Sequence, residues 1–319
     1  MTSGVFLDLD SLHPQDLDLT ELRDSLPTWT FFDQTHPGQV AERLSVAEVV
    51  VTNKVCLVGE HLRTAPALRL VCVAATGTNN VDLQAAAEAG IVVSNARNYA
   101  TASVTEAVFA LLLSLVRQLD RYRAQVAAGH WSESPYFCLF DTPIEELSGK
   151  TLGIIGYGVL GQAVAQCAQA FGMRVIVCQR LHGQPVEGRV PLQTILATSD
   201  VISLHCPLAA STRNLIGAPE LKAMKRSAIL INTARGGIVN EAALVDALRR
   251  GEIAGAGFDV AREEPPPADS PLLNYPSPSL IVTPHVAWAS RSARQRLVNE
   301  TTENIRAFRL GRPRNQVIG

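Results

Sequence analysis

The chain lacks the sequence features that mark secreted, membrane-spanning or disulfide-stapled proteins. Its six cysteines are scattered through 319 residues without a C-x-x-C pair, and most lie in apolar runs, so we expect free and mostly buried thiols. No apolar run approaches the roughly 20 residues that a membrane-spanning helix needs. The N-terminus has no basic region followed by a long apolar one, so no signal peptide is expected. These absences favour a cytoplasmic protein.

The chain also has almost no excess of positive or negative charge. The net charge is −2, and no basic block or alternation of basic and aromatic residues occurs, which excludes an obvious nucleic-acid surface. No metal site is expected. Hydrophobic residues make up 47% of the chain and charged residues 18%, a balance that allows a sizeable core and argues against disorder. The length predicts about two domains.

The most informative motif is a G-x-G-x-x-G turn at residues 156–161. It follows a strand-like run at 151–155, opens a helix-like run at 162–171, and is followed by a second strand-like run at 174–177. In this context the first glycine permits a tight turn, the second admits a pyrophosphate, and the third lets helix and strand pack closely. The helix N-terminus then attracts the phosphates. The turn therefore predicts a dinucleotide site; the alternative is an ordinary glycine-rich connection.

Strand-like and helix-like segments alternate along both halves of the chain, which predicts parallel sheets covered by helices. The first half has five short strand-like runs: Val5–Leu7, Trp29–Phe32, Glu48–Val51, Leu70–Val73 and Ile91–Val93. The second half has six: Thr151–Ile155, Arg174–Val177, Asp200–Leu204, Ala228–Ile231, Ala254–Phe258 and Leu280–Val282. The predicted fold class is α/β, with two Rossmann-like, doubly wound parallel sheets.

Three further segments have distinct patterns. Ser103 and Glu106 form a capping-box pattern, and apolar residues at helical spacing follow, so a long helix is expected to begin there. The segment 131–143, rich in aromatics, Ser and Pro, predicts a loop. Residues 290–309 predict one amphipathic helix.

The end of the second strand of the nucleotide-binding half carries the signal for cofactor choice. An acidic residue usually stands there to bind the ribose 2′-hydroxyl, but this chain has Gln179 followed by Arg180. The absence of a carboxylate removes repulsion of a 2′-phosphate, and Arg180 offers a positive partner for it. We therefore predict NADP(H), or dual use with NAD(H). The alternative is that Arg180 is a solvated loop residue.

Three polar residues stand where strands are predicted to end: Arg235, Glu264 and His285. Ligands of open α/β sheets bind beyond the carboxyl ends of the strands, so one crevice can collect all three. An arginine can hold the carboxylate of a 2-keto acid and polarise its carbonyl, and a histidine can donate a proton. A carboxylate beside the histidine fixes its tautomer. Taken singly, each residue also has an ordinary structural explanation.

These motifs together resemble those of the D-isomer-specific 2-hydroxyacid dehydrogenase family. The resemblance rests on 156–161, on Asn232–Val239, on Phe258–Val260 with Glu264-Pro265, and on Thr283–His285. It implies a homodimer of two-domain chains with a cleft between the domains. The implied substrate-binding domain is discontinuous, residues 1–100 and 288–319, and the dinucleotide-binding domain is 101–287. By resemblance Arg235 binds substrate, Glu264 orients the histidine, and His285 is the acid and base.

The resemblance and the motifs give a set of ligand-binding residues. Those predicted to bind the cofactor are Gly156, Gly158, Val159, Leu160, Gly161, Gln179, Arg180, Cys206, Pro207, Thr233, Ala234 and Asp259. Those predicted to bind substrate are Asn53, Lys54, Thr76 and Gly77, together with Arg235 and His285. Trp131 has two open interpretations, packing within its loop or reaching a partner subunit.

Within the family, the segments at 52–54, 74–82, 131–135 and 285–290 most resemble the glycerate dehydrogenase and hydroxypyruvate reductase branch. The leading hypothesis is therefore reversible, NAD(P)-dependent reduction of hydroxypyruvate or glyoxylate to D-glycerate or glycolate. One alternative is the same chemistry on another 2-keto acid. Another is a nucleotide-sensing scaffold like the corepressors that resemble this family.

Overall fold

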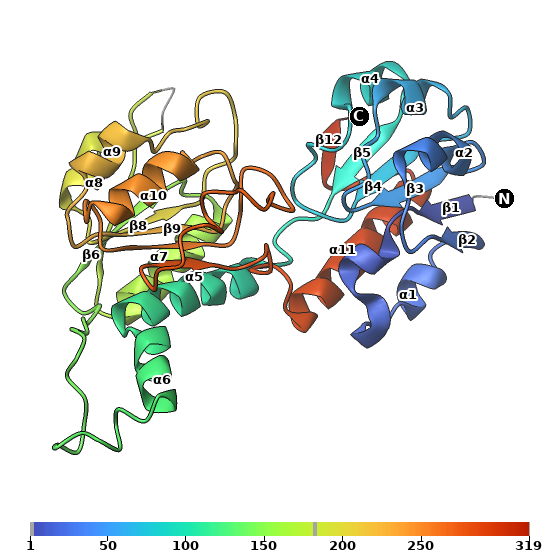
Figure 1. The fold of residues 1–319 in the computed structure, drawn as a ribbon. Coiled ribbons are helices and arrows are strands. Elements are labelled where there is room, and N and C mark those ends of the chain that lie inside the picture. Colours follow the sequence, from blue (N-terminus) through green and yellow to red (C-terminus); the bar gives the residue numbers. More distant parts are fainter. Residues whose placement is uncertain (1–2, 181–183, 319) are drawn as a thin grey trace. The chain divides into compact units, whose positions relative to one another are not determined.

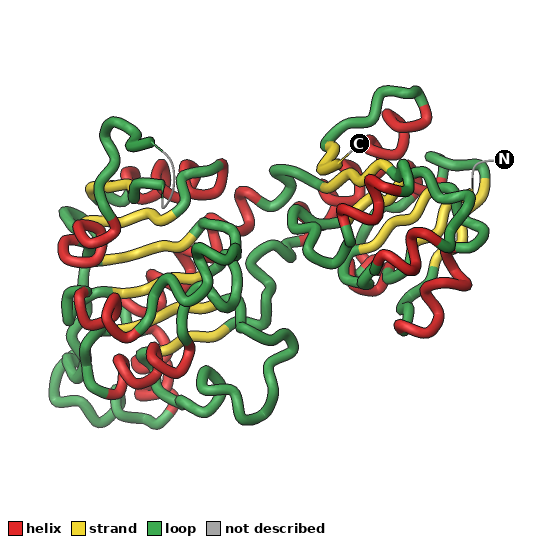
Figure 2. Tube along the Cα trace, turned by 90° about the horizontal axis from the view of Figure 1, so that it is seen from above, coloured by secondary structure: helices red, strands yellow, loops and turns green. Residues whose placement is uncertain are grey.

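The structure, a computed structural model, describes residues 3–180 and 184–318 and divides into two compact units. The first consists of Met1–Ala100 and Ala289–Gly319, and the second of Thr101–Trp288. Each unit contains one six-stranded sheet with helices on its faces (Figures 1 and 2). The prediction of two doubly wound α/β sheets is confirmed.

The sheet of the first unit has the order β12-β5-β4-β3-β1-β2. Its strands are β1 (Ser3–Phe6), β2 (Thr28–Phe31), β3 (Val49–Thr52), β4 (Leu70–Val73), β5 (Val92–Asn95) and β12 (Gln316–Ile318). All pairs are parallel except β12 with β5. Every residue of β3 and β4 is buried, as expected of parallel strands covered on both faces.

The helices of the first unit are mostly short. They are α1 (Thr20–Arg23), α2 (Val40–Leu44), α3 (Gly59–Arg63), α4 (Leu83–Glu88) and α11 (Arg291–Arg309), with 3-10 turns at Leu9–Leu12, Pro14–Asp16 and Pro37–Gln39. The predicted C-terminal helix is α11, red in Figure 1, which packs on β4 and β5. Its buried positions Leu297, Thr301 and Ile305 recur every four residues. The two ends of the chain thus build one core.

The sheet of the second unit has the order β11-β10-β9-β8-β6-β7 and is parallel throughout. Its strands are β6 (Thr151–Ile155), β7 (Arg174–Val177), β8 (Val201–Leu204), β9 (Ile229–Asn232), β10 (Gly255–Phe258) and β11 (Leu280–Val282). Its helices are α5 (Thr101–Val116), α6 (Leu119–Ala127), α7 (Val159–Ala170), α8 (Leu192–Thr198), α9 (Ala218–Ala223) and α10 (Glu241–Arg249).

Helix α5 begins two residues before its predicted start. It begins at Thr101, so Ser103 is a buried residue of its first turn and not the N-cap, and the predicted capping box is wrong. The Ser103 hydroxyl instead donates to the Ala287 carbonyl at 2.6 Å. At the other end Gln118 has a φ of +53°, and the chain bends by 58° into α6. The apolar face of α5 packs on β9, β10 and α7.

Residues 128–150 contain neither helix nor strand, which confirms the loop predicted at 131–143. The loop extends from the second unit below α6 (Figure 1). Four of its aromatic side chains are exposed: Trp131, Tyr136, Phe137 and Phe140. Trp131 donates its indole N–H to the Phe137 carbonyl at 2.9 Å, which stiffens the tip.

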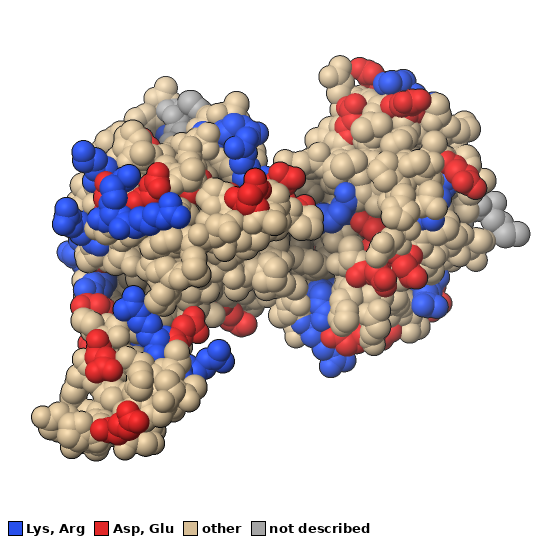
Figure 3. Space-filling view, in the orientation of Figure 1, with Lys and Arg blue, Asp and Glu red and all other residues tan. Residues whose placement is uncertain are grey.

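Two surface properties follow from the fold. Among the described residues no single helix is long and apolar enough to cross a membrane; only α5 and α6 taken together, across their bend, pass by length and composition. Basic side chains over α9 and α10 have acidic ones among them (Figure 3). There Arg249 pairs with Asp246 at 3.5 Å and Arg250 with Glu252 at 3.0 Å.

Candidate active site

Arg235, Glu264 and His285 all lie beyond the carboxyl edge of the second sheet. They follow β9, β10 and β11, which are neighbours in the order β11-β10-β9. In a parallel sheet the carboxyl ends of adjacent strands share one edge, so three residues far apart in sequence come from adjacent positions in space. The strand-end argument from the sequence therefore holds for their placement.

His285 and Glu264 form a direct pair. The imidazole Nδ1 lies 2.6 Å from Oε2 of Glu264, and the other carboxylate oxygen accepts the Ala261 N–H at 3.0 Å. Both side chains are part-exposed, at 29% and 36%. A carboxylate at Nδ1 holds the proton on that nitrogen and leaves Nε2 to exchange a proton with a substrate. His285 itself has a φ of +56°, a left-handed conformation that side chains other than glycine rarely adopt.

Asp259 forms hydrogen bonds with the segment that carries His285. Its carboxylate is buried and accepts the backbone N–H groups of Val286 and Ala287 at 2.9 and 2.8 Å and the Thr283 hydroxyl at 2.5 Å. These bonds fix the chain on both sides of His285. Asp259 was predicted to contact the cofactor; in the structure its carboxylate is engaged by three donors of this segment. No sequence pattern indicates that role, because two of the three partners are backbone groups.

Arg235 stands on a turn held by Asn232. The Asn232 side chain donates to the Arg235 carbonyl at 3.0 Å and accepts the Ala234 N–H at 3.1 Å. The next residue, Gly236, packs so closely on the loop after β10 that an added Cβ would lie 1.8 Å from the Ala261 oxygen. The turn of Arg235 and the loop that binds Glu264 are therefore in backbone contact, which brings two of the three candidate residues to neighbouring turns.

The glycine turn has the geometry that a dinucleotide requires. Gly156 has a φ of +98°, and a Cβ there would lie 2.5 Å from the Cys206 nitrogen. A Cβ on Gly161 would lie 2.2 Å from the Gly156 oxygen, whereas one on Gly158 would meet nothing within 4 Å. Gly158 is also the N-cap of the 12-residue helix α7 and gives it no side-chain cap. Val159 and Leu160 form the first turn, whose N–H groups suit a phosphate.

The predicted walls of the cofactor site are uncharged, and their exposure ranges from the buried Thr233 to the exposed Pro207. Burial raises the pKa of the Cys206 thiol to about 11, so it stays neutral beside Pro207. Burial also lowers the pKa of His205 to about 4 and keeps its imidazole neutral, with Nε2 2.9 Å from the Ser203 hydroxyl. The buried Thr233 hydroxyl, next to Ala234 at the end of β9, has no hydrogen-bond partner within the described part of the chain. A buried hydroxyl of this kind suits a polar ligand.

Gln179 occupies the predicted place but is engaged by its own chain. Its side-chain amide donates to the carbonyls of Val186 and Arg189 at 2.9 and 3.2 Å, and its oxygen accepts the Val186 N–H at 2.9 Å. Arg180 is exposed, and residues 181–183 lie outside the described part of the chain. Gln179 therefore braces the segment after β7 in this structure.

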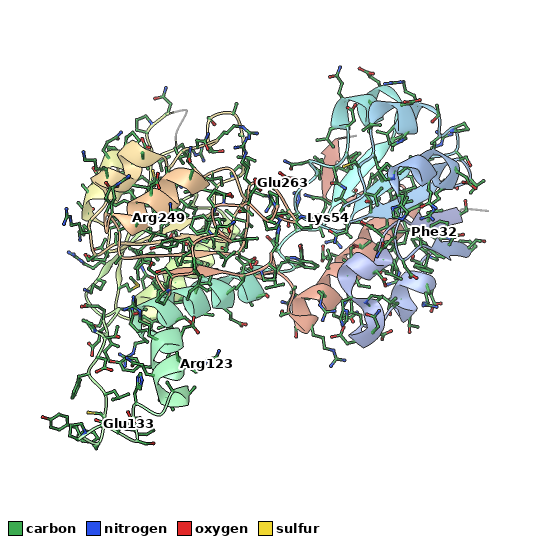
Figure 4. The ribbon with its side chains drawn as sticks, viewed as in Figure 1. Phe32, Lys54, Arg123, Glu133, Arg249 and Glu263 are labelled. Carbon is green, nitrogen blue, oxygen red and sulfur yellow. The ribbon has the colours of Figure 1, made fainter. Side chains whose placement is uncertain are left out.

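The residues predicted to bind substrate belong to the first unit. Asn53 and Lys54 follow β3, and their N–H groups donate to the buried Asp8 carboxylate at 2.8 and 2.6 Å. Lys54 is labelled in Figure 4. Val55 donates to the same carboxylate at 3.2 Å. Burial raises the pKa of Asp8, against the lowering effect of these bonds. Sequence reasoning did not identify Asp8 as the residue that shapes this turn.

The second predicted substrate turn follows β4. The Thr76 hydroxyl donates to the Ala96 carbonyl at 3.0 Å, and the Thr76 carbonyl accepts the Asn95 amide at 2.7 Å. Both partners lie at the end of β5, so Thr76 and the neighbouring Gly77 are held at the carboxyl edge of the first sheet. The two candidate turns of this unit thus share one sheet edge with each other.

Two other features do not join the candidate site. A cavity of about 350 Å³ opens at the opposite, amino edge of the second sheet, lined by Lys150, Asp200, Ile229 and Gly255 among others. It contains none of the candidate residues. In the described residues, no group of three or more His, Cys, Asp or Glu side chains is placed to hold a metal ion.

Comparison with known proteins agrees with this geometry. The family model for the NAD binding domain of D-isomer specific 2-hydroxyacid dehydrogenases matches residues 109–287. A glycerate dehydrogenase of Methylorubrum extorquens is 48% identical over 316 residues, 98% of each chain. A hydroxypyruvate reductase of Blautia hydrogenotrophica is 39% identical over 320 residues, again 98% of each.

Solved structures show the same two-domain fold. An acyclic imino acid reductase in complex with NADPH and D-Arg superposes with a TM-score of 0.88 at 27% identity, over 99% of this chain and 100% of that one. The likeness extends over both units, and the sequence relatives match at both ends of the chain. The chain belongs to the D-isomer specific 2-hydroxyacid dehydrogenase family.

Proposed function

We propose that this protein reduces hydroxypyruvate or glyoxylate to D-glycerate or glycolate with a nicotinamide dinucleotide, reversibly. The observation that carries the proposal is the His285–Glu264 pair at 2.6 Å, on the same sheet edge as Arg235 and the glycine turn. Relatives named glycerate dehydrogenase and hydroxypyruvate reductase, at 48% and 39% identity, support the substrate class.

In the proposed reaction the bound dinucleotide supplies a hydride to the keto carbon. His285 donates the proton from Nε2 to the carbonyl oxygen, while Glu264 keeps Nδ1 protonated and stabilises the imidazolium before transfer. Arg235 pairs with the substrate carboxylate and draws electron density from the carbonyl. Asp259 holds the backbone on which His285 stands, so the ring keeps its direction as its charge changes.

The chain's own residues are proposed to divide the binding work between the two units. The glycine turn at 156–161, the Cys206-Pro207 wall and Thr233 hold the dinucleotide in the second unit, and we favour NADP(H) over NAD(H). In the first unit, Asn53, Lys54 and the Thr76-Gly77 turn bind the carboxylate and hydroxymethyl group of substrate. We propose a cytoplasmic homodimer, and the exposed aromatic loop 131–141 supports a contact between subunits.

A substrate matrix with one variant tests the activity. Purified protein is assayed at 340 nm with several 2-keto acids against NADH and NADPH, alongside His285→Ala. We expect the highest kcat/KM with hydroxypyruvate or glyoxylate, and a kcat lower by about 10²–10⁴-fold in the variant, because the proton donor is lost. Binding of the dinucleotide should be almost unchanged.

A surface histidine provides the control. His36→Ala, at an exposed position of the first unit, should leave kcat within about twofold, as is usual for surface substitutions. Turnover retained in His285→Ala would refute the assigned acid. Absence of turnover with every 2-keto acid, in a protein that binds the dinucleotide, would favour the scaffold alternative. A higher kcat/KM with NADH than with NADPH would refute the cofactor preference.

A further inference from the structure

The segment after β7 folds back onto the end of that strand. The Gln179 N–H donates to the Val190 carbonyl at 2.7 Å, and the Val190 N–H donates to the Val177 carbonyl at 2.9 Å. The three side-chain bonds of Gln179 to Val186 and Arg189 close the same connection. Residues 186–190 are therefore fixed against β7, and the side chain of Gln179 is used for this and not turned to a ligand.

This folded-back segment presents an arginine to the glycine turn. The guanidinium carbon of Arg189 lies 5.7 Å from the centre of the Tyr157 ring, and Tyr157 is the second residue of the G-x-G-x-x-G motif. Arg189 is half-buried, and its positive charge partly offsets the burial that raises the pKa of Cys178, the residue after β7. In the described part of the chain it forms no ion pair, and residues 181–183 (Leu-His-Gly) contain no acid.

Arg189 lies near the place where a bound dinucleotide is expected to put the 2′ position of its adenosine ribose. In a doubly wound sheet the 2′ position of the adenosine ribose lies beyond the end of the second strand, beside the glycine turn. Arg189 is joined to the end of the second strand through the backbone bonds of Val190, and its guanidinium carbon lies 5.7 Å from the ring of Tyr157 in the glycine turn. A guanidinium in that position offers charge-assisted donors to a phosphate dianion, whereas Arg180 is exposed.

We propose that Arg189 binds the 2′-phosphate of NADP(H), and that Gln179 is a positioning residue that holds the segment carrying it. The inference rests on the proposed function only in requiring a dinucleotide at the glycine turn. It changes the assignment from the sequence, in which Gln179 and Arg180 themselves met the phosphate.

Binding of adenosine nucleotides tests the proposal without catalysis. Isothermal titration calorimetry measures adenosine 2′,5′-bisphosphate and 5′-AMP on the wild type, Arg189→Ala, Arg180→Ala and Arg249→Ala. The last is a matched control, because Arg249 (labelled in Figure 4) lies 5.7 Å from the Tyr275 ring but at the end of α10. Arg189→Ala should weaken the bisphosphate by about 10–100-fold, the usual range for a charged hydrogen bond, and 5′-AMP by less than about twofold. Arg249→Ala should change neither.

Each other outcome decides a different point. Equal weakening of both nucleotides in Arg189→Ala, or none, overturns the assignment, and selective weakening in Arg180→Ala alone returns the role to that residue. If the wild type binds 5′-AMP and adenosine 2′,5′-bisphosphate with equal affinity, this inference is wrong, while the dehydrogenase proposal is unaffected. A wild type that binds neither nucleotide contradicts the dinucleotide site itself.

A double-mutant cycle tests the positioning role of Gln179. Gln179→Ala should reduce the preference for the bisphosphate over 5′-AMP in the wild-type background, because the segment is released from β7. In the Arg189→Ala background it should have no further effect on that preference, since the two residues act through one contact. Additive losses would show that Gln179 acts independently, and would refute its role as a support for Arg189.

Discussion

The two sheets of this protein have the same strand order around their first strands, yet they differ at the point where the order reverses. In the first unit β1 lies between β2 and β3, and in the second β6 lies between β7 and β8. Ligands of doubly wound sheets bind at this reversal point. In the first unit the Asp8 carboxylate stands there and accepts three N–H groups of the loop after β3. In the second, Gly156 brings the turn against the backbone of His205 and Cys206.

Both sheets have a reversal point where a ligand could bind, and the residue after the first strand determines whether the N–H groups there are free for a ligand. In the first unit the Asp8 carboxylate, after β1, accepts the N–H groups of the loop after β3, so these groups already have an anionic partner within the chain. A glycine after β6 has no side chain, so the amides at the start of α7 remain for a phosphate from outside. The fold alone therefore does not assign the dinucleotide to either unit.

The largest expected effect comes from giving the second reversal point a side chain. Gly156→Ala places a Cβ 2.5 Å from the Cys206 nitrogen at a φ of +98°, so the turn has to move. We expect dinucleotide affinity to fall by about 100-fold or more and the protein to lose about 2–4 kcal/mol of stability, as for overpacking combined with backbone strain. Titration calorimetry and urea denaturation measure the two effects.

Gly158→Ala sharpens the same test. A Cβ there meets nothing within 4 Å, and the backbone conformation suits any residue, so the unfolding free energy should change little. Affinity for the dinucleotide should still fall, because the methyl group lies where the pyrophosphate approaches the backbone. Equal stability losses in the two variants would contradict the distinction between a glycine needed for packing and one needed for the ligand.

A smaller effect is expected from opening the first reversal point. Asp8→Ala leaves three N–H groups after β3, one buried and two part-buried, without their acceptor, which should cost about 1–3 kcal/mol. Hydrogen exchange of the Asn53, Lys54 and Val55 amides should accelerate, while amides of the second unit keep their protection. Ser45→Ala, on an exposed turn after α2, serves as the control. Unchanged exchange at residues 53–55 would refute the role of Asp8.

The smallest effect concerns a carboxylate of the same unit in an open setting. The Arg294 guanidinium, at 2.7 Å, lowers the pKa of Asp16 to about 2, whereas burial raises the pKa of Asp8. The stabilisation from Asp16 is therefore complete above about pH 4 and is lost as the pH falls toward 2. Asp8 has the opposite sign, because its protonated form is favoured by folding. Melting temperatures between pH 2.5 and 5 should fall less steeply on acidification in Asp16→Asn than in the wild type; equal slopes would contradict the assignment.

Much of the fold follows from local sequence. The ranges of β4, β7 and β11 agree with their predictions to the residue, because short β-branched runs between turns leave little ambiguity. β12 was not predicted, since three residues carry no periodicity and Gln316–Ile318 becomes a strand only by pairing with the edge of β5. The bend at Gln118 between α5 and α6 was not predicted, because a single left-handed residue has no pattern.

The candidate site divides in the same way. Glu264 and His285 follow adjacent strands and form a direct pair, as their residue types and their positions after strands indicated. Asp8, Asp259 and Gln179 escaped prediction in their present roles because each acts by accepting or donating bonds to backbone groups, and such partners carry no signature in the sequence. The strand-end pattern predicted where Arg235, Glu264 and His285 lie, and it missed the side chains that hold the neighbouring backbone in place.

The left-handed backbone of His285 has a consequence for engineering. Asparagine and glycine tolerate a φ of +56° better than histidine does, so either replacement should make the folded protein more resistant to heat. A screen that selects variants only by melting temperature would thus favour loss of the proposed proton donor. Improvement of this enzyme for use at high temperature needs a selection that scores turnover as well, with position 285 excluded from the library.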